Sequence, residues 1–256
     1  MEATVKSYKN NLYVIQYGAE SIKGAFAEEP ISHESKKLME YLAEHISTKE
    51  PSEKGFALDE PYATLYYILS WLHMVKAGTD PVSDDPHWEI SCDPVFHLEP
   101  GPPMIAVQMA AYQPVINWIE SIGASHTDLP LLYISSQEAE EKAKTDVNNY
   151  IGEENSQPIL DQWNSLTVNQ KAAGMFLQYQ IDPGYRHSLC GATMLLKGLI
   201  SEQQFAEICC AADNISSYLG DVSEVMFKNL YNHFKEMGLS VKKVVDMLDD
   251  AANPGL

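Results

Sequence analysis

The chain has 256 residues, 45% of them hydrophobic, with a formal net charge of −19 and a pI near 4.7. This length suits one large domain or two smaller ones, and the hydrophobic content is that of a globular protein. The strong negative charge disfavours nucleic acids and anionic membrane surfaces as partners, and it suits a soluble protein or one that meets a basic partner.

The N-terminal third is expected to mix strands and helices. Residues 12–17 are aromatic and β-branched and predict a strand, and residues 21–23 predict a second extended piece. Ser32 is the expected N-cap of a helix over residues 34–46, whose apolar side chains share one face. The polar residues 47–54 that follow predict a loop.

A second helix, rich in tyrosine and leucine, is predicted over residues 61–76. Six prolines then punctuate residues 79–103, with a short extended piece predicted at residues 88–92. We interpret this stretch as the join between a mixed β/α N-terminal domain, residues 1–98, and a helical C-terminal domain, residues 99–256.

The segment over residues 99–125 predicts a long core helix behind a proline-rich entry. Pro114 is expected to kink this helix without ending it, and Gly123 is expected to close it. Its apolar residues recur at helical spacing and form the predicted buried stripe: Met104, Val107, Ala111, Val115, Trp118 and Ile122.

The rest of the chain reads as almost entirely helical. Residues 129–134 predict a short apolar link and residues 137–151 a solvated surface helix. Capping boxes at residues 167–170 and 201–204 each predict a helix start. The predicted helices cover residues 167–180, 189–199, 201–212, 222–237 and 241–248. The predicted fold class is therefore α+β.

The four cysteines, Cys92, Cys190, Cys209 and Cys210, are too few for a disulfide framework in a chain of this size. The N-terminus has neither an apolar signal core nor an arginine-rich presequence, and no apolar run approaches the roughly 18 residues of a spanning helix. These features predict a soluble protein of the bacterial cytoplasm or the mitochondrial matrix.

No recognised catalytic or cofactor motif is present. There is no GxSxG, no phosphate-binding loop and no GxGxxG, and the cysteines and histidines lack the paired spacings of zinc sites. A Cys–His nucleophile pair is formally possible from any of the four cysteines and eight histidines, and the pair considered for a small-molecule enzyme is His187 with Cys190. Without a catalytic signature, the many aromatic residues and the acidity favour binding to another protein, with no metal and no cofactor.

Several stretches resemble one known family. The best runs from Cys92 through Glu99, Pro100 and Gln108 to the segment 112–118, YQPVINW. Others are the helical hairpin over residues 166–209 and the N-terminal strand and helix ending at His45, where the family usually has tryptophan. In this pattern the chain resembles the assembly chaperones that protect the α subunit of F-type ATP synthase. The family's functional glutamate and its tryptophan correspond to Ser217 and Leu219 here.

The resemblance implies a monomeric, non-catalytic chaperone that shields the apolar interface of the unassembled α subunit and neither binds nucleic acid nor inserts into membranes. Two alternatives remain open: a module of the same fold with a different client, and an enzyme that uses His187 and Cys190. The expected contact residues are Tyr112, Trp118, Tyr179, Tyr185, Asp213 and Tyr218.

Overall fold

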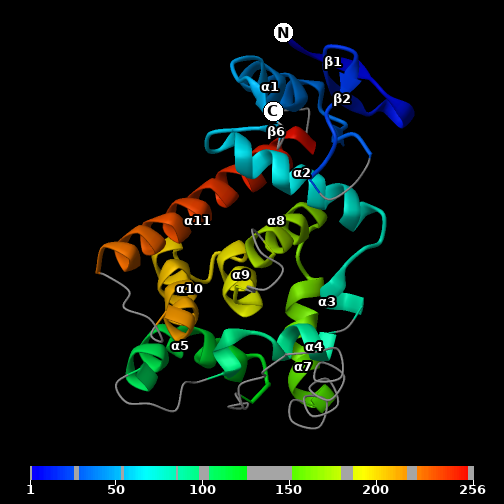
Figure 1. Cartoon of the computed structure of the whole chain (residues 1–256). Coiled ribbons are helices and arrows are strands. Elements are labelled where there is room, and N and C mark those ends of the chain that lie inside the picture. Colours follow the sequence, from blue (N-terminus) through cyan, green and yellow to red (C-terminus); the bar gives the residue numbers. More distant parts are fainter. Residues whose placement is uncertain are drawn as a thin grey trace, which may run out of the picture. The chain divides into compact units, whose positions relative to one another are not determined.

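The computed structural model describes residues 2–25, 29–52, 55–84, 86–97, 104–125, 152–179, 187–217 and 224–252 (Figure 1). Contacts divide the chain into two compact units. Unit 1 comprises Met1–Thr79, Val168–Phe176 and Leu239–Leu256, and unit 2 comprises Asp80–Thr167 and Leu177–Gly238. Because the chain crosses between them several times, each unit is assembled from segments that are distant in sequence. The predicted domain boundary between residues 98 and 99 stays a prediction.

Unit 1 is built on a small antiparallel sheet. Its strands are β1 (Ala3–Ser7), β2 (Tyr13–Tyr17), β3 (Glu20–Ser21) and β4 (Ser32–His33). β2 pairs with each of the other three strands. The predicted strand at residues 12–17 is confirmed as β2. No strand was predicted for residues 3–7, and β1 leads into β2 through the short 3-10 turn η1 (Lys9–Asn11).

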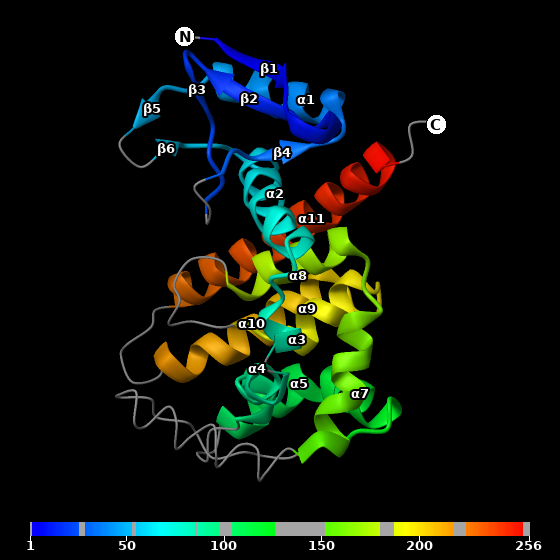
Figure 2. The ribbon, with the colours of Figure 1, turned by 90° about the vertical axis from the view of Figure 1, so that its right-hand side faces the viewer.

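The helix α1 (Lys36–Ser47) packs against this sheet, as Figure 2 shows. Its buried side chains recur three and four residues apart and form one apolar face: Leu38, Met39, Leu42, Ala43 and Ile46. The cap prediction was wrong. Ser35, not Ser32, caps the helix, because the Ser35 side chain accepts a hydrogen bond from the Leu38 amide while Ser32 lies in β4.

The loop predicted at residues 47–54 contains the strand β5 (Pro51–Ser52), which pairs with β6 (Gly55–Phe56). The helix α2 (Tyr62–Lys76) follows and confirms the prediction for residues 61–76. Unit 1 also holds the first part of α8 (Val168–Gln178) and the last part of α11 (Glu224–Ala252). There Asn169 donates a hydrogen bond of 2.7 Å to Asp249.

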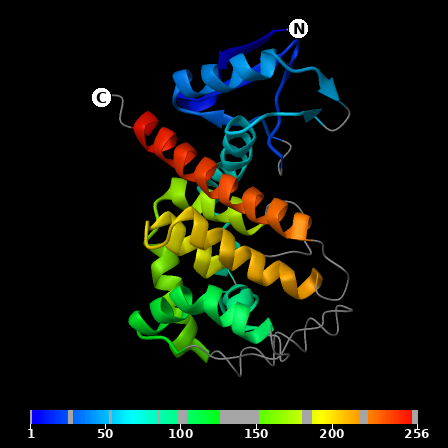
Figure 3. The same ribbon diagram turned by 90° about the vertical axis from the view of Figure 1, so that its left-hand side faces the viewer.

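Unit 2 is helical throughout the residues that the structure describes. Its elements are α3 (Pro81–Asp84), α4 (Pro86–Ser91), the 3-10 turn η2 (Pro94–Phe96), α5 (Met104–Ser121), α7 (Gly152–Asn164), α9 (Leu189–Leu196) and α10 (Glu202–Ser217). The helices α5, α9 and α10 pack together, and α4 packs on α7. Figure 3 shows α10 beside α9 and α5. The predicted α+β fold class is confirmed.

Three predictions in unit 2 need correction. Residues 88–92 are not extended, because α4 covers Pro86–Ser91. Val107 of α5 is 50% exposed, and the buried face of that helix passes instead through Gln108 and Tyr112. The helix predicted over residues 189–199 ends at Leu196, since Gly198 turns the chain with a φ of 69° and Leu199 is exposed.

The two helices predicted at residues 222–237 and 241–248 are one continuous helix, α11. Gly238 is buried inside this helix, and a Cβ placed on it would lie 3.4 Å from both Glu202 and Leu195. Gly238 therefore lies within α11 and does not end it. The predicted elements at residues 129–134 and 137–151 lie outside the described residues. None of the described helices is long and apolar enough to cross a membrane.

Candidate protein-binding site

Two of the expected contact residues, Tyr112 and Trp118, belong to the core of unit 2. Both lie on α5, which packs against α10, and their side chains are 0% and 8% exposed. Buried aromatic rings of this size stabilise the helix packing through the apolar area that they remove from water. Their assignment as partner contacts stays a prediction.

Tyr179, the third expected contact residue, is half-buried and bonded to the carboxylate of Glu89. Its hydroxyl donates a hydrogen bond of 2.5 Å to Glu89 Oε2, and Gln178 Nε2 donates another of 3.3 Å to the same oxygen. Glu89 itself is buried on α4. These bonds hold the end of α8 to α4, so the Tyr179 hydroxyl already has a hydrogen-bond partner inside the protein.

A second buried carboxylate, Asp93, organises the start of α9. Its Oδ2 accepts hydrogen bonds from the Cys190 amide at 2.7 Å and from the Ser188 hydroxyl at 3.0 Å, while its Oδ1 accepts one from the Val95 amide at 3.0 Å. Burial raises the pKa of Asp93, and the hydrogen bonds from Cys190, Val95 and Ser188 act in the opposite direction. Asp93 thus joins η2 to the first turn of α9.

Neither Glu89 nor Asp93 was expected from the sequence to have a role. The available signal was the Asp93-Pro94 pair, since an aspartate before a proline is a common start for a helical turn. Apart from Val95, the partners of the two carboxylates lie some 90 residues further along the chain, so no local pattern could reveal them.

The arrangement around Cys190 opposes nucleophilic chemistry. Burial, and then the neighbouring Asp93, raise the pKa of the Cys190 thiol well above its ordinary value. A reactive cysteine needs the reverse, a positively charged setting that favours the thiolate. The His187 ring packs edge-on against Phe234 at 4.8 Å, and burial together with nearby His233 lowers the pKa of His187 to about 4. His187 is therefore neutral near pH 7 and supplies no positive charge to favour a thiolate.

No cluster of three or more His, Cys, Asp or Glu side chains suited to a metal ion occurs in the described part of the chain. Tyr185 and Tyr218 lie outside the described residues, as do Leu219 and Gly220. Asp213 and Ser217 lie on α10, of which the structure describes the backbone at these positions.

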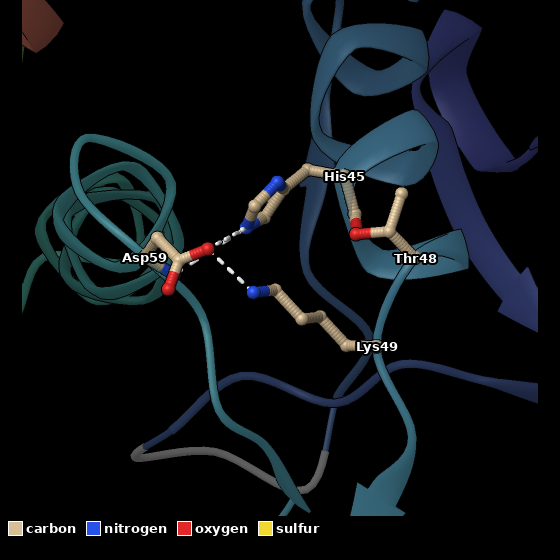
Figure 4. Close-up of polar contacts among 4 residues, drawn as sticks. All are labelled: His45, Thr48, Lys49 and Asp59. Atoms are coloured by element: carbon tan, nitrogen blue, oxygen red, sulfur yellow. Dashed lines mark hydrogen bonds and ion pairs between the residues drawn. The ribbon is translucent and has the colours of Figure 1, made fainter.

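His45 occupies the position where the resembling family has tryptophan, and it retains an aromatic role. Its ring stacks on Tyr62 with centroids 3.7 Å apart and planes 5° from parallel. Its Nε2 accepts a hydrogen bond of 3.3 Å from the Asp59 amide, and Lys49 pairs with the Asp59 carboxylate (Figure 4). Burial, and then Lys49, lower the pKa of His45. This cluster ties the end of α1 to the start of α2.

Large apolar side chains that reach solvent are natural contacts for a protein partner. In unit 2 these are Val107 on α5 and Leu199 in the turn after α9, and in unit 1 they are Tyr67, Val168 and Leu239. Tyr67 is 37% exposed, and its ring stacks on Phe176 at 5.9 Å. The helix predicted over residues 61–76 is rich in tyrosine, and Tyr67 is its exposed tyrosine.

No protein-family model and no curated protein matches the chain. Solved structures do share its fold. The crystal structure of Atp12 from Paracoccus denitrificans has a TM-score of 0.54 and 11% identity, and the match covers 97% of this chain and 96% of that one. A point mutant of the P. denitrificans Atp12p gives a TM-score of 0.53 with the same identity and coverage. The chain therefore has the Atp12 fold over nearly its whole length.

Proposed function

We propose that this protein is a non-catalytic assembly chaperone that binds the unassembled α subunit of the ATP synthase catalytic head and shields its apolar interface. The observation that carries the proposal is the fold. Over 97% of the chain it matches the fold of Atp12, the ATP synthase α-subunit assembly chaperone. Independent support comes from the sequence runs around Cys92, Gln108 and Trp118, which resemble the same family.

The proposed mechanism is binding alone, without nucleotide hydrolysis. Exposed side chains such as Tyr67 and Leu199 would contact apolar surface on the client, and the net charge of −19 would speed encounter with a basic client surface. The buried groups of unit 2 support this role because Glu89 and Asp93 fix its helices and the Cys190 thiol is held protonated. The compartment proposed is the bacterial cytoplasm or the mitochondrial matrix.

The test uses the purified α and β subunits of the ATP synthase from the same organism. Each subunit is diluted from denaturant with and without this protein, light scattering follows aggregation, and size-exclusion chromatography detects complexes. We expect suppression of α-subunit aggregation, a complex with the α subunit, and release of this protein when the β subunit is added.

An unchanged scattering curve for the α subunit together with no complex would refute the proposed client. A complex with the β subunit alone would instead favour the alternative of the same fold with a different client. That alternative rests on Ser217 and Leu219, which stand where the family has glutamate and tryptophan.

A further inference from the structure

The strand β1 forms an edge of the sheet in unit 1. Among the described residues it pairs with β2 alone, in a register that places Val5 opposite Ile15. In an antiparallel pair, successive residues point their backbone groups alternately toward the partner strand and away from it. Val5 therefore either bonds to Ile15 or turns both its N–H and C=O outward.

Two hydrogen bonds identify the outward-facing positions. The Ile15 carbonyl accepts a bond of 2.8 Å from the Ile22 amide on the far side of β2, so it does not face Val5. The Ala3 amide bonds to the Ser47 hydroxyl at 2.8 Å and not to β2. Ala3 and Val5 are two residues apart and share one direction, so Val5 presents an N–H and a C=O at the open edge. The Ser47 hydroxyl occupies the Ala3 amide, whereas no described residue bonds to the Val5 amide.

A depression of about 300 Å³ lies beside this edge, between β1 and α1. Its apolar part is formed by Ala3, Val5 and Ala43, and its polar part includes the carboxylates of Glu2, Glu40 and Glu44. Lys36 pairs with Glu40 at 2.7 Å. Glu2 and Glu44 have no cationic partner among the residues that the structure describes.

We propose that the β1 edge binds an extended, basic segment of a partner protein as an additional strand, with a lysine or arginine side chain of that segment in the depression lined by Glu2, Glu40 and Glu44. Strand addition to a sheet edge takes its affinity from main-chain hydrogen bonds and its specificity from pockets for alternate side chains. Here the Val5 amide and carbonyl would make the main-chain hydrogen bonds. The acidic depression beside them would be the pocket that selects a basic side chain.

Charge complementarity selects the occupant. A second copy of this chain would bring another net charge of −19 to an acidic edge, and this repulsion disfavours pairing of two copies. A basic segment is instead attracted to the glutamates beside this edge. Any protein with such a segment would fit this edge, whether or not it is the ATP synthase α subunit.

The test measures fluorescence anisotropy of a labelled peptide of alternating lysine and valine, with a peptide of alternating glutamate and valine as its counterpart. We expect the basic peptide to bind with micromolar affinity and the acidic peptide at least about tenfold more weakly. Val5→Pro removes the outward N–H, and proline is tolerated on an edge strand, so this variant should abolish binding of the basic peptide. The matched Val5→Ala also loses the valine side chain but keeps the N–H, and it should retain binding.

A charge-based variant makes the result independent of the proline. Glu2→Gln with Glu44→Gln should weaken binding about tenfold, whereas Glu120→Gln with Glu207→Gln, which removes two exposed charges elsewhere, should change it less than about twofold. Equal binding by the Val5→Pro protein, once circular dichroism shows it folded, would overturn the proposal. So would equal weakening by both pairs of glutamine substitutions. Sedimentation that finds a dimer dissociated by Val5→Pro would assign the edge to a second copy and also overturn it.

Discussion

Replacing Asp93 tests the view that unit 2 is held together by buried carboxylates. Asp93→Ala leaves three buried donors without an acceptor: the amides of Val95 and Cys190 and the hydroxyl of Ser188. Each costs about 1–3 kcal/mol when unpaired, and release of a buried charge offsets part of the sum. We expect the free energy of unfolding to fall by about 3–5 kcal/mol, a large share of the roughly 5–15 kcal/mol typical of a domain.

Urea unfolding followed by far-UV circular dichroism measures this change. Asp161→Ala, which removes an exposed carboxylate from α7, is the matched control and should stay within about 0.5 kcal/mol of the parent. Asp93→Asn keeps the shape and one acceptor and should cost about 1–2 kcal/mol. A loss below about 1 kcal/mol for Asp93→Ala, with an unchanged dependence on urea, would refute the assigned role of this carboxylate.

Three further predictions concern other parts of the fold. Gly238→Ala should stabilise the protein by about 0.5–1 kcal/mol, because the new methyl group meets Glu202 at an ordinary contact distance and alanine favours a helix, and the thermal midpoint measures this gain. Ser35→Ala should cost about 1 kcal/mol in urea unfolding through loss of the cap of α1, while Ser32→Ala should cost about half of that or less. Burial lowers the pKa of His33 to about 4, so the folded protein holds this side chain neutral above that pH. The free energy of unfolding should therefore be highest above pH 6.5 and fall by at most about 3 kcal/mol as the pH falls toward 4.

Each of these has an outcome that would contradict it. A lower thermal midpoint for Gly238→Ala would mean that α11 is interrupted at that residue or that its neighbours cannot give way. Equal costs for Ser35→Ala and Ser32→Ala would remove the assignment of the cap. For His33, unfolding is measured at several pH values, and His33→Asn should reduce the slope between pH 6.5 and 4. An unchanged slope would place that pH dependence on other groups.

Local patterns in the sequence predicted most of the helices because a cap or an apolar stripe depends on residues only a few positions apart. The capping box of Ser201 and Gln204 is an example. Each residue's backbone amide donates to the other's side chain, at 3.0 and 3.2 Å, and α10 begins where the box predicts. The helix α2 was predicted on the same basis.

The tertiary structure decided what depends on distant neighbours. The helices predicted separately at residues 222–237 and 241–248 form the single helix α11. Val107 fits an apolar stripe by its spacing, yet it is 50% exposed and its neighbour Gln108 is buried, although Val115 and Trp118 of the same stripe are buried as predicted. Periodicity gives the width of an apolar face, whereas only the packed neighbours fix its direction.

The sequence by itself determined the α+β class, the acidic character and the resemblance to a chaperone family. It did not determine which polar residues hold the fold, because Asp93 and its partners Ser188 and Cys190 are joined across more than ninety residues. Nor did it reveal the open edge of β1, since an edge is defined by the absence of a neighbouring strand among the described residues. Burial and strand order are properties of the folded chain. They show that the Asp93 carboxylate is hydrogen-bonded within the fold and that the backbone groups of Val5 lie at the sheet edge.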